Sequence, residues 1–294
     1  MKDIIVITGG AGFIGSHVVD LFIKKTKYKI VSIDNYSSGS RKNHIQNKRV
    51  KYIKGDTRNL SKLLKGVKNK IHSLFHFGEF SRIYQSFINM DQCIKSNTIG
   101  SNEVFNFCMN NKIKLIYSAT SASLGNKGYD KDLSPYAFSK AKNLEFLNNL
   151  KKWFDFKYEV IYFYNVYGPR QICEGEMATV IGIFENSYKK NKFLPVVKPG
   201  SQRRNFTHVK DTVEACYKAW KMSKNRHYSV YNKKSYSILE VSKLFGVPIK
   251  LMPKRSGERY SSALTKINLS NKVHIFEAKI DLKKYIEKVI KSIL

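Results

Sequence analysis

Residues 4–15, IIVITGGAGFIG, decide the fold of this chain. The first five are apolar or β-branched, which predicts a buried strand, and an amphipathic segment at 13–25 predicts a helix directly after the glycines. Between them, Gly9, Gly12 and Gly15 follow the spacing GxxGxxG. Glycine lets a backbone turn sharply and approach a pyrophosphate, and a helix N-terminus offers free N–H groups and a positive dipole end. The stretch therefore predicts a dinucleotide-binding unit.

An acidic residue follows at the expected distance. Asp34 ends the second predicted strand, 19 positions beyond Gly15. Its carboxylate would accept both hydroxyls of an adenosine ribose and repel a 2'-phosphate, so the position favours NAD over NADP. Arg41 and Lys42 lie nearby, and a cation in a loop would suit a phosphate. NADP therefore stays open as the alternative cofactor.

Short apolar runs alternate with longer helical patterns along the first half of the chain, which predicts a parallel sheet with crossover helices. The fold class is α/β, a Rossmann-type doubly wound parallel sheet with a smaller C-terminal substrate-binding lobe. Residues 1–165 are predicted to bind NAD, with 205–231 returning to that domain, and 166–294 to form mainly the lobe. The predicted strands are 4–8, 30–33, 50–54, 74–77, 114–118 and 158–163, and the predicted helices 13–25, 86–111, 136–153, 209–222, 238–245 and 282–294.

Composition excludes several protein classes. The 294 residues are 42% hydrophobic and 26% charged, which is typical of a globular protein and not of a disordered or disulfide-scaffold chain. No apolar stretch is long enough to span a bilayer and no signal-peptide pattern is present, so we expect a cytoplasmic protein. The four cysteines show no CxxC spacing, which predicts no metal site.

Charge does not decide the function. The 53 basic and 22 acidic residues leave a net charge of +31, a balance that permits nucleic-acid binding. However, 43 of the 53 are lysines scattered in ones and twos, and no basic-aromatic module appears. A solvated lysine-rich surface is favoured, an attractive field for an anionic small substrate comes second, and nucleic acid is the remaining alternative.

Tyr136 and Lys140 form the second motif, YxxxK. Ser134 and Pro135 precede them and predict a helix start. Residues four apart share a helix face, so the Lys140 ammonium would lie near the Tyr136 phenol, or share a ribose with it, and lower its pKa. The hydroxyl-rich stretch 117–125 follows the fifth predicted strand at its carboxyl end, where open α/β sheets bind ligands.

With these motifs in this order, the chain resembles the extended short-chain dehydrogenase/reductase family, in its NAD-dependent nucleotide-sugar epimerase/dehydratase branch of the UDP-glucose 4-epimerase type. The resemblance covers essentially the whole chain. It implies the catalytic residues Thr120, five positions before Gly125, with Tyr136 and Lys140. It implies NAD-binding by Gly9, Gly12, Phe13, Ile14, Gly15, Asp34, Asn35, Asp56, Thr57, Phe77, Gly78, Tyr136 and Lys140. It implies substrate binding by Glu79, Thr120, Asn165, Arg204, Arg255 and Glu258.

The segment 76–82, HFGEFSR, departs from the family, which usually has HLAA there. The departure places an acidic and an aromatic residue close to the nicotinamide and leaves the identity of the sugar open. The link from Thr120 to Tyr136, 16 residues long, is also shorter than in many relatives. One wall of the sugar pocket is therefore expected to be trimmed.

The two residues after Thr120 predict the type of reaction. Family dehydratases have Asp-Glu there, whereas this chain has Ser121 and Ala122, which supply no acid or base for elimination. The resemblance then implies NAD-dependent 4-epimerisation of a UDP-linked hexose or N-acetylhexosamine. A reductase, dehydratase or other epimerase acting on a GDP- or dTDP-sugar is the enzymatic alternative, and Glu79 is the nearby carboxylate that would serve it. A homodimer through helices 86–111 and 136–153 is expected.

Overall fold

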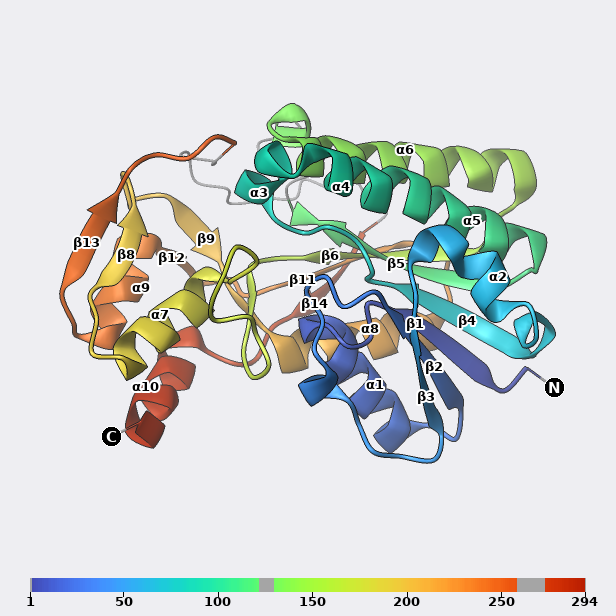
Figure 1. Cartoon of the computed structure of the whole chain (residues 1–294), viewed down its shortest axis with the longest axis horizontal. Coiled ribbons are helices and arrows are strands. Elements are labelled where there is room, and N and C mark those ends of the chain that lie inside the picture. The colour runs from blue at the N-terminus through green and yellow to red at the C-terminus, as the bar shows by residue number, and fades with distance from the viewer. Residues whose placement is uncertain (1, 122–129, 258–272, 294) are drawn as a thin grey trace.

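The core of the protein is one parallel sheet of eight strands in the order β14-β11-β6-β5-β4-β1-β2-β3 (Figure 1). The computed structural model describes residues 2–121, 130–257 and 273–293. The strands are β1 (Ile4–Thr8), β2 (Lys29–Asp34), β3 (Val50–Lys54), β4 (Ile71–His76), β5 (Lys114–Thr120), β6 (Tyr158–Phe163), β11 (His227–Tyr231) and β14 (Val273–Glu277). The predicted Rossmann-type α/β fold is confirmed.

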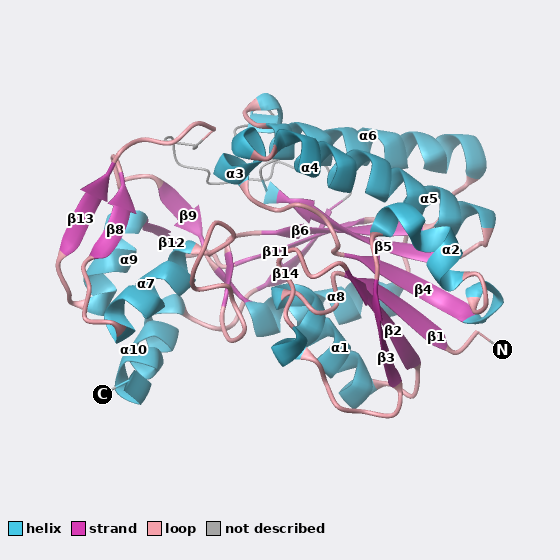
Figure 2. Cartoon of the chain, viewed as in Figure 1, coloured by secondary structure: helices cyan, strands magenta, loops and turns pink. Residues whose placement is uncertain are grey.

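Helices cover both faces of this sheet, as Figure 2 shows in cyan against magenta. On one face lie α2 (Leu60–Leu64), α5 (Ser101–Asn110) and α6 (Pro135–Phe154). On the other lie α1 (Phe13–Lys25) and α8 (Val209–Met222), which pack against each other. The strands are apolar because both of their faces are buried under helices. Two cores result, one on each side of the sheet.

A smaller lobe packs around a third core. It contains α7 (Val180–Lys189), α9 (Ile238–Phe245) and α10 (Leu282–Ile293). Two strand pairs accompany them, β8 (Leu194–Val197) with β13 (Ile249–Met252) and β9 (Arg203–Asn205) with β12 (Ser235–Ser237). A further short pair joins β7 (Val166–Tyr167) to β10 (Thr207–His208). The predicted helices 209–222 and 238–245 are confirmed to the residue, whereas α7 and these short strands were not predicted.

The chain returns to the large sheet twice after the lobe begins. Helix α8 and strand β11 lie within 205–231, the stretch predicted to return. Strand β14, at 273–277, also pairs with β11, although the predicted division assigned it to the lobe. It is an edge strand of five residues that follows a stretch that the structure does not describe. The division into two domains otherwise stays a prediction.

The helical stretch predicted over 86–111 is confirmed, but the structure divides it into several pieces. The structure has α3 (Ile83–Ile88), α4 (Met90–Ile94), a π-helical turn (Lys95–Gly100) and α5. Asn89 leaves helical geometry between α3 and α4, with φ −111° and ψ 46°. The π turn then frees the Asn97 carbonyl, which accepts a hydrogen bond of 2.6 Å from Asn143 on α6. Such turns are frequent at functional sites.

No helix within the described parts of the chain is long and apolar enough to cross a membrane.

Candidate functional site

A cavity of about 900 Å³ lies between the carboxyl ends of the sheet strands and the smaller lobe. Parallel sheets bind ligands at this edge because the loops that leave neighbouring strands diverge there. The cavity is lined by the glycine-rich turn after β1, the ends of β2, β4 and β5, the start of α6, and residues of the lobe. Of the predicted site residues, Glu258 lies outside the described residues, as do Ala122 and Gly125, on which two of the predictions depend.

The glycine-rich turn is tight enough to exclude side chains. Gly9 has φ +70°, and a Cβ there would lie 2.8 Å from the backbone nitrogen of Gly78 and the carbonyl oxygen of Phe77. A Cβ on Gly15 would collide with the Gly9 carbonyl. Helix α1 starts after Gly12 without a side-chain cap and without an acidic residue in its first turn. Its first N–H groups are therefore available to an anion in the cavity.

Asp34 connects this turn to the next loop. One carboxylate oxygen accepts a hydrogen bond of 3.0 Å from the Ala11 backbone nitrogen, and the other accepts one of 2.8 Å from the Tyr36 nitrogen. Burial raises the pKa of the carboxyl, and the backbone hydrogen bonds oppose that shift. Asp34 lines the cavity, and each oxygen keeps a lone pair for a ribose hydroxyl. It thus also orders two loops, which the sequence did not indicate.

A second carboxylate, that of Asp56, lines the same cavity as Asp34. Asp56 accepts hydrogen bonds from Arg58, at 2.8 Å from Nε, and from Asn35 Nδ2 at 3.2 Å. Burial disfavours the charged form, but the hydrogen bonds outweigh it and the pKa of Asp56 lies below its ordinary value. Thr57 follows, buried. All four residues line the cavity, so an ionised acceptor is present at Asp56, one of the residues predicted to bind NAD.

These features fit an NAD molecule. A turn with no room for side chains and an uncapped helix N-terminus suit the pyrophosphate, and Asp34 suits a ribose without a 2'-phosphate. Phe13, Ile14, Phe77 and Gly78 also border the cavity, as predicted. That they contact the cofactor stays a prediction.

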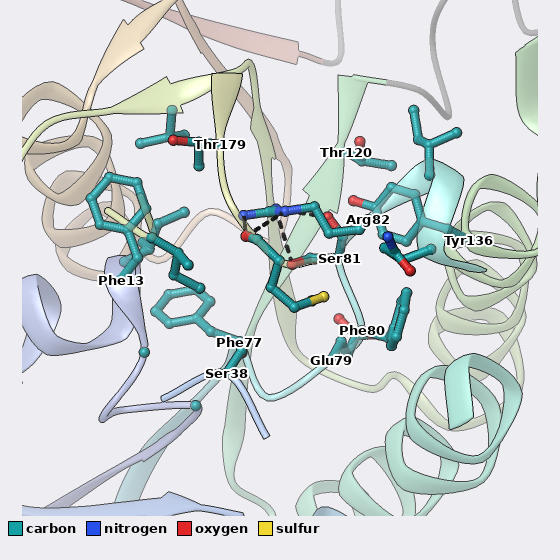
Figure 3. A pocket seen from close by; sticks show the side chains of 18 of the residues that line it. Phe13, Ser38, Phe77, Glu79, Phe80, Ser81, Arg82, Thr120, Tyr136 and Thr179 are labelled. Carbon is teal, nitrogen blue, oxygen red and sulfur yellow. Dashed lines mark hydrogen bonds between the residues drawn. The ribbon is translucent and has the colours of Figure 1, made fainter. Parts of the chain in front are cut away.

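The three predicted catalytic residues face the cavity from two elements. Thr120 ends β5, and Tyr136 and Lys140 lie one turn apart at the start of α6, which Ser134 caps by accepting a hydrogen bond from the Ala137 nitrogen. All three line the cavity, and Figure 3 shows Tyr136 and Thr120 on the same side of it. Lys140 forms an ion pair with Glu79 and donates to the Ser118 carbonyl. The structure thus brings together the YxxxK motif, the end of β5 and the unusual segment 76–82.

Arg82 also belongs to the segment 76–82, and its role was not indicated by the sequence. In the structure it lines the cavity. Its Nε and Nη2 donate to the Met177 carbonyl at 2.9 and 2.6 Å, and its Nη1 donates to the Ser81 carbonyl at 2.9 Å (Figure 3). Burial lowers the pKa of Arg82, and its electrostatic interaction with Tyr136 opposes that shift. Arg82 is therefore a second cation close to Tyr136. The departure of segment 76–82 from HLAA could have drawn attention to Arg82, but the sequence alone did not indicate which residue it contacts.

The lobe side of the cavity holds the predicted substrate residues. Arg204 on β9 is 7% exposed, and Asn165 follows β6 with its Nδ2 donating to the Asn205 carbonyl at 3.0 Å. Arg255 lies with its guanidinium carbon 5.4 Å from the centre of the Tyr84 ring. Gln202, 4% exposed, has an Oε1 with no hydrogen-bond partner among the described residues. All four line the cavity, which gives this wall two cations and a free acceptor.

Comparisons with known proteins agree with this arrangement. The sequence profile of the NAD-dependent epimerase/dehydratase family matches residues 5–232. An ADP-L-glycero-D-manno-heptose-6-epimerase of Fusobacterium nucleatum is 31% identical over 234 residues, which cover 72% of this chain and 70% of that protein. A putative UDP-glucose 4-epimerase of Methanocaldococcus jannaschii is 31% identical over 221 residues, covering 72% and 71%. Among solved structures, the UDP-N-acetylglucosamine 4-epimerase of Methanobrevibacter ruminantium, in complex with UDP-N-acetylmuramic acid, superposes with a TM-score of 0.81 at 28% identity, covering 100% of this chain and 98% of that one.

Proposed function

The chain belongs to the NAD-dependent epimerase/dehydratase family, and from that premise we propose that it interconverts the C4 epimers of a UDP-linked hexose or N-acetylhexosamine through a transient 4-keto sugar. One observation carries the proposal: Thr120, Tyr136 and Lys140 open on the same cavity as the glycine-rich turn and Asp34. A sugar that entered from the lobe would meet these side chains beside the dinucleotide site.

Each residue has a chemical task in this reaction. When bound, NAD supplies a reversible acceptor for the hydrogen on C4. Tyr136, as phenolate, takes the proton of the C4 hydroxyl and later returns it to the same oxygen. Thr120 donates a hydrogen bond to that oxygen, and the positive charge of Lys140 favours the phenolate. A positioned acid or base of this kind contributes roughly two to four decades in rate.

The lobe wall suits a nucleoside diphosphate. Arg204 and Arg255 present two guanidinium groups toward the cavity, and arginine is well matched to phosphate oxygens. Asn165 and Gln202 add neutral polar groups. If the diphosphate is held here, the sugar can turn over between the two hydride transfers while its anchor stays fixed. A uridine base is supported by the names of the relatives in Methanocaldococcus and Methanobrevibacter.

A second candidate is epimerisation at C6 of an ADP-linked heptose. It is favoured by the Fusobacterium relative, which is as similar in sequence as the UDP-glucose 4-epimerase relative. The shared chemistry is oxidation and reduction of one sugar carbon. The two candidates differ in the nucleotide and in which carbon reaches Tyr136.

Elimination of water is disfavoured by the surroundings of Glu79, the carboxylate that the sequence suggested for it. Glu79 accepts from Ser101 at 2.8 Å and from Tyr117 at 3.0 Å, and it pairs with Lys140. Its side chain is 3% exposed. A carboxylate held by these donors is a poor general base for a sugar proton, because protonation would break the ion pair. Ser121, next to Thr120, has only a hydroxyl.

The decisive experiment is incubation of the purified protein, without added reductant, with a panel of UDP-, ADP-, GDP- and dTDP-sugars, followed by NMR of the products. We expect a UDP-hexose to become its C4 epimer, with no net absorbance change at the NADH wavelength and no 6-deoxy-4-keto product. Turnover of only an ADP-heptose would select the second candidate. Loss of 18 mass units from the sugar would contradict both.

The exposed side of the helices next to the site supports a homodimer. Phe87, Ile88, Met90, Ile99 and Phe138 are exposed by 42–58% on α3, α4, the π turn and α6. These elements overlap the two segments predicted to form a dimer interface. Exposed apolar groups gathered on neighbouring helices are typical of a contact surface. Sedimentation equilibrium should therefore give twice the chain mass of 34.0 kDa, and Phe138→Glu with Ile99→Glu should give the monomer.

A further inference from the structure

Glu79 is in direct contact with Lys140 and is buried among protein groups. Its Oε2 pairs with the Lys140 ammonium. Its Oε1 accepts hydrogen bonds from Ser101 at 2.8 Å, from Tyr117 at 3.0 Å and from Asn143 at 3.2 Å. The side chains of Lys140 and Glu79 are 4% and 3% exposed. These donors stabilise the ionised form of the Glu79 carboxylate.

Lys140 is held by the same arrangement from three sides. Its ammonium pairs with Glu79, donates to the Ser118 carbonyl and lies 4.2 Å from the centre of the Tyr117 ring. Burial lowers the pKa of Lys140, and Glu79 opposes that shift. Without Glu79 the ammonium would be a buried charge with no counter-ion, and such a lysine loses its proton readily.

We propose that Glu79 is a positioning residue, which acts through Lys140 by fixing its ammonium at the end of β5, in the cavity that the reacting group Tyr136 also lines. The inference rests on the proposed function, in which Tyr136 serves as acid and base. It also assigns a role to the segment 76–82 that departs from the family pattern. Glu79 itself does not bind the sugar in this proposal, which differs from the substrate contact expected from sequence.

The other groups that face the pair do not carry a charge near neutral pH. His76 on β4 has its pKa lowered by burial to about 4, and Cys93 on α4 has its pKa raised by burial to about 11. Burial and the neighbouring Glu79 raise the pKa of Tyr117 on β5, so its hydroxyl stays a donor. Tyr136 on α6 interacts electrostatically with Tyr117, and the charged group that interacts with Tyr136 from the other side is Arg82. Removal of the Glu79 charge should therefore change the protonation of Lys140 and, through it, that of Tyr136.

The test is a double-mutant cycle with Glu79→Gln and Lys140→Met. Glutamine keeps the shape and an acceptor oxygen but removes the charge. We expect Glu79→Gln to lower kcat by about tenfold to hundredfold while KM for the sugar nucleotide changes less than threefold. The loss should grow as pH rises above 7, because the unpaired Lys140 gives up its proton. In the Lys140→Met background, Glu79→Gln should have no further effect on kcat.

Thermal unfolding provides a readout that needs neither substrate nor turnover. Glu79→Gln should lower Tm, and adding Lys140→Met should restore part of the loss because no buried ammonium then lacks a partner. Glu103→Gln is the matched control. Glu103 lies on α5, two residues beyond Ser101, and accepts from the Ser61 backbone nitrogen at 3.0 Å. It should leave the pH dependence of kcat unchanged.

Three results would overturn the proposal: an equal loss of kcat in both backgrounds, a rise in KM with kcat unchanged, or additive changes in Tm. If the wild-type protein turns over no sugar nucleotide, the proposed function fails, and the Tm cycle then decides this proposal on its own. Coupling in Tm would support the Lys140–Glu79 pair, and additivity would refute it.

Discussion

Arg82 and Met177 connect the two sides of the cavity. The guanidinium donates two hydrogen bonds to the Met177 carbonyl, at 2.9 and 2.6 Å. Arg82 follows β4 of the large sheet, whereas Met177 belongs to the loop that leads to α7 in the smaller lobe. A charged donor paired with a carbonyl in a partly enclosed site gives a strong hydrogen bond. The contact therefore fixes this loop over the cavity.

Arg82→Met should weaken substrate binding by releasing that loop. Hydrogen bonds of charged groups contribute about 1.5–3 kcal/mol each, so a KM increase of about tenfold or more for the sugar nucleotide is expected. Hydrogen exchange of residues 172–179 should become faster.

Arg49→Met is the control for Arg82→Met. Arg49 donates to the carbonyls of Thr26 and Ile23, both at 2.6 Å, and does not line the cavity. It should reduce stability without changing KM. Equal effects of the two variants on KM would show that Arg82 has no special place at the site.

Tyr136→Phe should lower kcat by roughly two to four decades, the usual effect of losing a positioned acid or base. NAD binding, measured by calorimetry, should stay within a few-fold of wild type. Tyr162→Phe serves as control, since the Tyr162 hydroxyl bonds to His227 at 2.8 Å away from the cavity. A loss of less than tenfold for Tyr136→Phe would remove that residue from the mechanism.

Asp34→Asn should relax the preference for NAD over NADP. The amide keeps an acceptor for one of the two loop nitrogens but no longer repels a 2'-phosphate. The ratio of the two Kd values from calorimetry should move toward NADP by about tenfold. Asp20→Asn, on the outer side of α1, should leave the ratio unaltered. Tighter binding of NADP than NAD by the wild type would exclude this role for Asp34.

Stability should fall as pH drops from 6.5 to 4. Burial lowers the pKa of His76, His208 and His227 to about 4 in the folded protein, whereas in the unfolded chain it is near 6.5. The unfolded state therefore binds more protons within this window, and the free energy of unfolding rises with pH through it. For fully buried His76 the difference amounts to about 3 kcal/mol, since one pKa unit corresponds to about 1.4 kcal/mol.

Urea unfolding at several pH values measures this dependence. His227→Phe removes one of the histidines whose pKa is lowered by burial, so the slope between pH 4 and 6.5 should decrease. A slope that is flat in the wild type, or unchanged in the variant, would contradict the assignment.

Local sequence patterns were sufficient to predict those helices and strands whose apolar residues recur with the period of the element. The strand 4–8, the helix 13–25 and the helix 209–222 were predicted with their observed bounds. The helical stretch predicted over 86–111 was also correct, but its breaks at Asn89 and at the π turn were not predicted. Within the π turn, Asn97 accepts a hydrogen bond from the Phe80 nitrogen and donates one to the Ser139 hydroxyl on α6, and the local pattern indicates neither contact.

The sequence by itself determined the α/β fold, the position of the glycine-rich turn and the family, because those depend on residue types at short, regular spacing. Only the tertiary structure decided the partners of the charged groups. Lys140 and Glu79 are 61 positions apart, and Arg82 and Met177 are 95 apart. Whether two such residues meet depends on where the strands end and on where the loops of the lobe lie, and no local pattern encodes that. In the proposed reaction, the chemistry at Tyr136 depends on these long-range pairs.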